Sequence, residues 1–208
     1  MNKNTPVLKM VQISLLSALV VVLQIFFSQI KVGVVTLNFV LVPIVIAGTL
    51  IGPMAGLIVG AFAGLTTFIQ VFTSGDVFYV FLMTNNAFAT ALICILKTAA
   101  AGFLAGVIYR LVTGIGNSSK GRNYAGAAAA SIICPTVNTA IFVLGMLTFF
   151  GSAFAADATF GPMVGGNLVS FVIIGLVGVN FFFELALTLI VSPLICQALQ
   201  NAGLFRKK

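Results

Sequence analysis

Lys97 and Glu184 are the residues of this chain best placed to do chemistry, because each lies deep inside a long apolar segment. The other Lys, Arg and Asp residues lie near a terminus or a predicted loop. A charge near the centre of a bilayer costs from about 3 to over 10 kcal/mol unless it is paired or faces water. The two charges therefore predict either an internal ion pair or a site for a polar ligand.

Two amides belong with these charges. Asn180 precedes Glu184 by one helical turn, so the two side chains share a face. At ~1.5 Å of rise per residue, Lys97 and Asn138 lie roughly 16 and 18 Å from the outer ends of their predicted helices. We expect these four side chains, from three helices, to converge on one cavity in the outer half to middle of the bilayer, where they would orient a small molecule.

The outer mouth of the cavity is expected to carry Gln70, Asn85 and Asn86, with Asp76 beside them. The predicted substrate-binding set is Lys97, Asn138, Asn180, Glu184, Asn85, Asn86 and Gln70. No catalytic residue, cofactor or metal ligand is predicted, because the chain has no His and its three cysteines are isolated in apolar segments.

Structural roles compete with this interpretation. Lys97 and Glu184 could neutralise each other and lock the fourth helix to the sixth. Asn138 could satisfy backbone hydrogen-bonding groups freed by the nearby Pro135. An ion pair that also lines the cavity would reconcile the structural and functional roles of the charges.

The composition indicates a protein that resides in lipid. Of 208 residues, 61% are hydrophobic and 6% are charged, with a mean hydropathy of +1.22, whereas a soluble domain has about 25% charged residues. The net charge of +7 does not indicate nucleic-acid binding, because the basic residues lie in loops between apolar segments and accompany no reader motif.

The apolar runs predict an all-α membrane protein, a bundle of six transmembrane helices in a single domain over residues 1–208. The predicted helices cover about 10–27, 34–51, 54–72, 86–112, 124–150 and 165–199, with a possible short helix over 77–83. An even number of spans leaves eight basic residues on the side of the termini and only Lys31 on the other. Both termini are therefore expected to be cytoplasmic.

Small residues recur at the four-residue spacing that lets membrane helices pack closely. One row comprises Gly48, Gly52, Gly56, Gly60 and Gly64, interrupted by a turn at Pro53. This row is expected to pack helices inside the protein. A second pair, Ser14 and Ala18 in the first helix, is available for an outside partner.

Several segments resemble, in order and spacing, the substrate-binding S components of energy-coupling factor (ECF) transporters. The resemblance covers nearly the whole chain and is least diagnostic in the first thirty residues. Its segments are Pro135–Phe142 with Gly145-Met146, Asn180–Glu184, Ser192-Pro193, Leu41–Ile44, Gly52–Gly56, Lys97–Gly102 and Arg110.

The resemblance implies a six-helix protein in a prokaryotic plasma membrane that binds a vitamin or related micronutrient from outside. It implies docking on a transmembrane T subunit that carries two ATPases, and toppling in the membrane to release the cargo. Small residues on the first helix of such proteins contact the T subunit, and Ser14 and Ala18 stand at the matching positions, Ser14 departing from the usual Ala. A P-loop is missing from the sequence, so active uptake would need a partner.

Two other functions remain open. A self-sufficient ion-coupled transporter or channel, acting as a homo-oligomer, would normally carry more intramembrane acids than Glu184. A membrane-embedded enzyme would need a nucleophile–base pair or metal ligands. For the substrate, one cationic side chain favours a carboxylate, so pantothenate is the first candidate, with folate or another heterocyclic micronutrient as alternatives.

Overall fold

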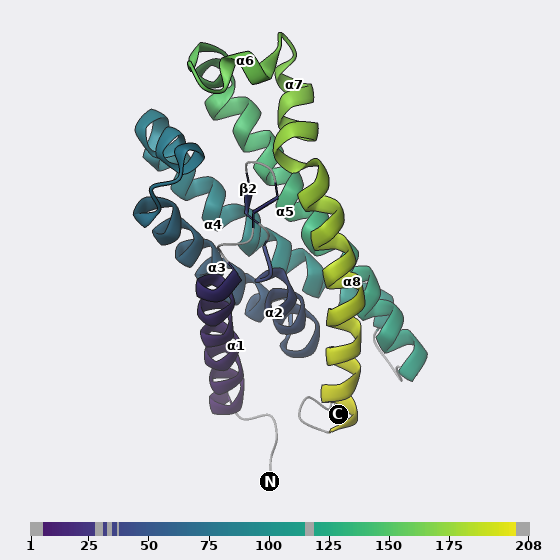
Figure 1. Cartoon of the computed structure of the whole chain (residues 1–208). Helices are drawn as coiled ribbons and strands as arrows, with labels where there is room; N and C mark the ends of the chain where they lie inside the picture. Colours follow the sequence, from purple (N-terminus) through teal and green to yellow (C-terminus); the bar gives the residue numbers. More distant parts are fainter. Residues whose placement is uncertain (1–5, 28–30, 33–34, 37, 115–118, 203–208) are drawn as a thin grey trace.

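The chain forms a bundle of long helices (Figure 1). The computed structural model describes residues 6–27, 31–32, 35–36, 38–114 and 119–202. In chain order the elements are α1 (Pro6–Phe27), β1 (Lys31–Val32), β2 (Val35–Thr36), α2 (Leu41–Ile46), the π-helical segment η1 (Ala47–Ile51), α3 (Pro53–Thr73), α4 (Val77–Thr113), α5 (Lys120–Ala156), α6 (Gly161–Val164), α7 (Leu168–Ser170), the π-helical segment η2 (Phe171–Val177) and α8 (Gly178–Asn201).

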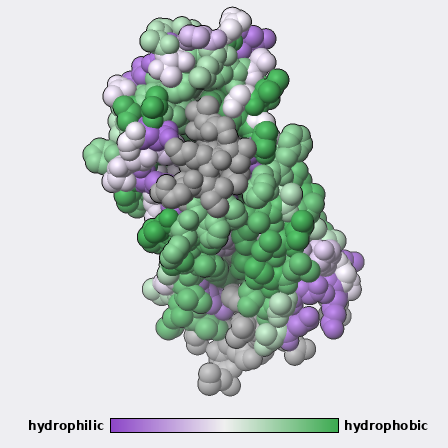
Figure 2. Space-filling model, viewed as in Figure 1, coloured by the Kyte–Doolittle hydropathy of each residue, from purple (hydrophilic) through white to green (hydrophobic). Residues whose placement is uncertain are grey.

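Among the described residues, five helical stretches are long and apolar enough to cross a membrane: α1, α3, α4, α5 and the continuous run of α7, η2 and α8. The stretch formed by α2 and η1 has eleven residues, about 16 Å of helix against a hydrocarbon core of about 30 Å. The start of α1 and the end of α8 lie at the same end of the bundle (Figure 1). Figure 2 shows hydrophobic residues over the middle of one face and hydrophilic residues toward its ends.

The predicted second helix is wrong in its first part. Two antiparallel strands of two residues each occupy this region, with Lys31 paired to Thr36 and Val32 to Val35. The helix begins only at Leu41. The apolar, β-branched residues that suggested an early helix start suit a strand equally well. An apolar run alone does not distinguish a strand from a buried helical segment.

The predicted last helix is also interrupted near its start. Gly165 and Gly166 have φ values of 54° and 83°, in the left-handed region that other residues avoid. Asn167 then caps α7, its Oδ1 accepting a 3.0 Å hydrogen bond from the Ser170 backbone N–H. The continuous run that follows begins three residues later than predicted, at Leu168.

Helix α4 has two legs separated by a kink at Asn86, whose φ of −160° and ψ of 88° are not helical. Asn86 Oδ1 accepts from the Ala89 N–H at 2.9 Å and so caps the second leg. The Thr90 hydroxyl lies 3.1 Å from the Leu82 carbonyl oxygen and ties the legs together. The short predicted helix over 77–83 and the predicted start at residue 86 correspond to these two legs.

Helices α3 and α4 meet backbone to backbone along a glycine seam, formed by Gly56, Gly60 and Gly64 on α3 against Cys94, Thr98 and Gly102 on α4. A Cβ added to Gly60 would lie 2.2 Å from the Thr98 carbonyl oxygen, and one added to Gly64 would lie 2.4 Å from that of Cys94. Neither space accepts a side chain. The seam therefore fixes the turn of α4 that carries Lys97.

Helices α5 and α8 are joined at Pro135. A proline has no N–H, so the carbonyl of the residue four positions earlier, Ser131, loses its helical donor. The Thr188 hydroxyl of α8 lies 2.9 Å from this carbonyl oxygen and 2.8 Å from the Glu184 carbonyl oxygen of its own helix, so its one proton can serve either acceptor. Thr188 is one turn from Glu184, so this contact also sets the height of Glu184 against α5.

The glycine seam predicts a sharp difference between two Gly→Ala variants. Gly60→Ala should lower the melting temperature of the detergent-solubilised protein markedly, because overpacking costs about 1–3 kcal/mol or more where backbone blocks the new methyl group. Gly75→Ala is the matched control, since a Cβ there meets no atom within 4 Å. Equal melting temperatures for the two variants would contradict the seam.

The Pro135 contact predicts a non-additive pair of substitutions. Thr188→Val should lower stability by about 1–3 kcal/mol, because it leaves the buried Ser131 carbonyl without its donor. In a Pro135→Ala background the new N–H can bond this carbonyl, so the same Thr188→Val change should cost distinctly less. A double-mutant cycle of thermal unfolding measures the coupling, and additive effects would rule the contact out.

Candidate functional site

A cavity of about 70 Å³ opens inside the bundle, room for several waters when one needs about 10–15 Å³ by the same measure. Residues from α1, α3, α4, α5, η2 and α8 form its wall, together with Asn38 just before α2. Four of the predicted binding residues, Lys97, Asn138, Asn180 and Glu184, line it together. The expected convergence of three helices on one cavity is therefore present.

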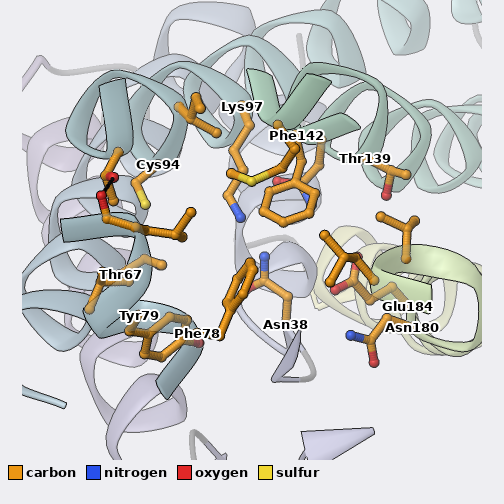
Figure 3. Close-up of a pocket in the computed structure, with 18 of the residues that line it drawn as sticks. Asn38, Thr67, Phe78, Tyr79, Cys94, Lys97, Thr139, Phe142, Asn180 and Glu184 are labelled. Atoms are coloured by element: carbon orange, nitrogen blue, oxygen red, sulfur yellow. Dashed lines mark hydrogen bonds between the residues drawn. The ribbon is translucent and has the colours of Figure 1, made fainter. Parts of the chain in front are cut away.

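Lys97 projects into the cavity from the α4 wall (Figure 3). Its Nζ lies 5.0 Å from the centroid of the Phe142 ring on α5, a cation–π contact. The side chain is half-buried. Among the described residues that line the cavity, it is the one cation and Glu184 the one anion.

Glu184 and Asn180 lie on the α8 side of the cavity, away from Lys97 (Figure 3). They are 6% and 5% exposed, and their four-residue spacing places them on one face. The Asn38 backbone N–H donates to the Glu184 carboxylate, which Lys97 also attracts electrostatically. Asn38 thus brings the start of α2 against the carboxylate.

Lys97 and Glu184 do not form the tight ion pair that a purely structural role requires. Within the described part of the chain, no salt bridge at the 4.0 Å limit joins them. Their attraction acts across the cavity, and the ammonium makes its cation–π contact with Phe142. Both groups line the cavity and can meet a ligand.

Asn138 does not take the structural role suggested by its proximity to Pro135. The carbonyl freed by the proline is that of Ser131, and Thr188 is its partner. Asn138 is 4% exposed and lines the cavity. In the described structure its Oδ1 has no hydrogen-bond partner, and a buried amide oxygen of this kind favours a ligand that can donate to it.

The other three predicted binding residues do not line the cavity. Gln70 accepts a hydrogen bond from Gln24 of α1, and Gln24 lines the cavity in its place. Asn85 donates to the Phe81 carbonyl oxygen at 2.9 Å. Asn86 caps the second leg of α4, so its side chain serves the kink.

Several cavity residues were missed by the sequence analysis. The polar ones are Gln24, Asn38, Thr67, Thr90 and Thr139, and the aromatic ones are Phe78, Tyr79, Phe142 and Phe181. Thr139 and Phe181 adjoin Asn138 and Asn180 in sequence, and Phe142 is one turn from Asn138, so helical spacing could have suggested them. Asn38 and Gln24 carry no such signal.

The predicted partner residues, Ser14 and Ala18, are both exposed on α1.

The three cysteines are free and buried, and Cys94 lines the cavity. Within the described residues there is no group of three or more His, Cys, Asp or Glu side chains able to hold a metal ion. Among the described residues, the cavity lining offers one cation, one anion, amides, hydroxyls and aromatic rings.

Comparison with known proteins identifies the family of this chain. The model of the family described as ECF transporter, substrate-specific component, matches residues 8–196. No curated protein matches the chain. The family match includes all four cavity residues that the sequence singled out, and it covers nearly the whole chain. This protein therefore belongs to the family of ECF transporter substrate-specific components.

Proposed function

We propose that this chain captures a carboxylated vitamin or related micronutrient from outside a prokaryotic cell and delivers it through a T subunit driven by two ATPases. Pantothenate is the first candidate. Family membership makes the chain a multi-pass membrane protein and a substrate-binding subunit, not an enzyme, and implies association with ECF T and ATPase modules. The vitamin, its carboxylate and the direction of capture are proposed here.

The observation that carries the proposed substrate is the Lys97 ammonium in the cavity. Lys97 is held on a helix fixed by the glycine seam, and Glu184 does not neutralise it through a salt bridge. A carboxylate beside the ammonium would make a charge-assisted hydrogen bond, among the stronger polar interactions in proteins. An anionic ligand also lowers the cost of keeping Lys97 in an apolar surrounding.

The orientation follows from the distribution of basic residues. Arg110 lies at the end of α4, and Lys120 and Arg122 at the start of α5, the end of the bundle where α1 begins and α8 finishes (Figure 1). Basic loops remain in the cytoplasm. We propose that both termini lie there and that the short α2–η1 stretch belongs to a sixth crossing.

Helix α1 is the proposed contact for the T subunit. Ser14 and Ala18 lie one turn apart and are exposed, and large apolar side chains of α1 such as Leu15 and Leu19 are exposed as well. Small residues at this spacing let another helix approach closely. A bulky side chain here should obstruct docking without reaching the cavity.

The proposed division of labour predicts that the purified chain binds its ligand alone but transports nothing by itself. In proteoliposomes, uptake should require the T subunit, both ATPases and ATP. Ala18→Trp should retain ligand affinity and lose most of the ATP-dependent uptake. Uptake by the chain alone, driven by an ion gradient, would overturn the proposal in favour of a self-sufficient transporter.

The role of Lys97 predicts a selective loss of binding. Lys97→Ala should weaken the affinity for an anionic ligand about tenfold or more, equivalent to at least ~1.4 kcal/mol, as measured by titration calorimetry with pantothenate or the co-purified compound. Lys120→Ala, which removes the same charge outside this cavity, is the control and should bind normally. Unchanged affinity in a well-folded Lys97→Ala protein would assign Lys97 a structural role.

A further inference from the structure

The cavity presents opposite charges on different walls. Lys97 projects from α4, whereas Glu184 lies with Asn180 on α8, and Asn38 is seen between the two sides (Figure 3). No salt bridge closes the space between the ammonium and the carboxylate in the described structure. A ligand in this cavity therefore meets two sites of opposite chemistry.

An ionised Glu184 side chain accepts hydrogen bonds and donates none. A carboxylate offers about four acceptor positions. The Asn38 backbone N–H occupies one of them. A ligand carboxylate placed here would be repelled, so the Glu184 wall suits a group that brings its own hydrogen, such as a hydroxyl, an amide N–H or an amine.

The rest of the cavity lining is mixed in character. Asn138 on α5 presents an amide whose Oδ1 has no partner among the described residues. The lining also has apolar surface, supplied by Phe142, Met146, Leu176 and Phe181. This lining suits a short ligand segment with apolar sides and a polar group of its own.

We propose that the cavity selects bipolar ligands, which carry different polar groups at their two ends. This proposal rests on the proposed function. One end is a carboxylate bound by Lys97. The other end carries hydroxyl or N–H donors bound by Glu184, and the Asn138 Oδ1 accepts from a further donor of the ligand. Glu184 is then a specificity residue that rejects acids of similar size without donors at the far end.

The first test identifies the bound ligand directly. The full-length protein is purified and then unfolded to release its bound small molecule. One portion of this compound is analysed by mass spectrometry after esterification, and another portion in deuterated solvent. We expect a compound that forms an ester and has at least two exchangeable hydrogens beyond its acidic one. An acid without further exchangeable hydrogens would overturn this inference and leave the proposed function standing, whereas release of a compound that is not an acid would overturn both.

The second test assigns the donor site to Glu184. Pantothenate and its analogue lacking both hydroxyls are titrated against the wild type, Glu184→Gln, and Asp157→Asn as a matched control at a carboxylate that caps a turn outside the cavity. The wild type and the control should prefer pantothenate by about tenfold or more, as expected for hydrogen bonds to a charged group. Glu184→Gln should lose most of this preference while retaining the contribution of Lys97.

Equal binding of the two compounds by the wild type would contradict the donor site. So would a preference that survives unchanged in Glu184→Gln. Thermal melting of each variant, with and without ligand, separates loss of the site from loss of folding.

Discussion

The contact between α3 and α4 is the constraint on which the site depends. Gly56, Gly60 and Gly64 bring the α3 backbone against α4 so closely that a single methyl group would collide with carbonyl oxygens. In lipid the hydrophobic effect contributes little to helix association. Close van der Waals packing of this kind therefore supplies much of the stability of the contact. A backbone contact also leaves little freedom to rotate, and rotation of α4 would move Lys97 out of the cavity.

On α3 the cavity lining begins one turn after the seam, whereas on α4 Cys94 belongs to both. Beyond Gly64 the next turn of α3 carries Thr67, a residue with a side chain, and Thr67 lines the cavity. On the opposite side, Thr188 and the freed Ser131 carbonyl tie α5 to α8 and hold Glu184 in place. Two helix pairs, one joined by glycines and one by a proline and a threonine, therefore form facing walls, and each wall carries one charge.

This arrangement explains how a strongly apolar protein keeps two charges within its bundle. Lys97 lies over an aromatic ring, and Glu184 accepts from a backbone N–H, so each is partly compensated without being consumed by the other. A direct ion pair would compensate both charges more completely, yet it would leave less for a ligand to bind. The separation of the two groups leaves both charges at the cavity wall.

The sequence alone predicts the membrane class, most of the long helices and four of the polar residues that line the cavity, because a polar group inside an apolar run is costly wherever the helix packs. It could not separate Asn138 from Asn85 and Asn86, whose side chains serve the local backbone. Nor could it find Gln24 and Asn38, which reach the cavity through packing with distant parts of the chain. Polarity and helical period are local properties, whereas the direction in which a side chain faces depends on kinks, helix rotation and backbone contacts that only the tertiary structure decides.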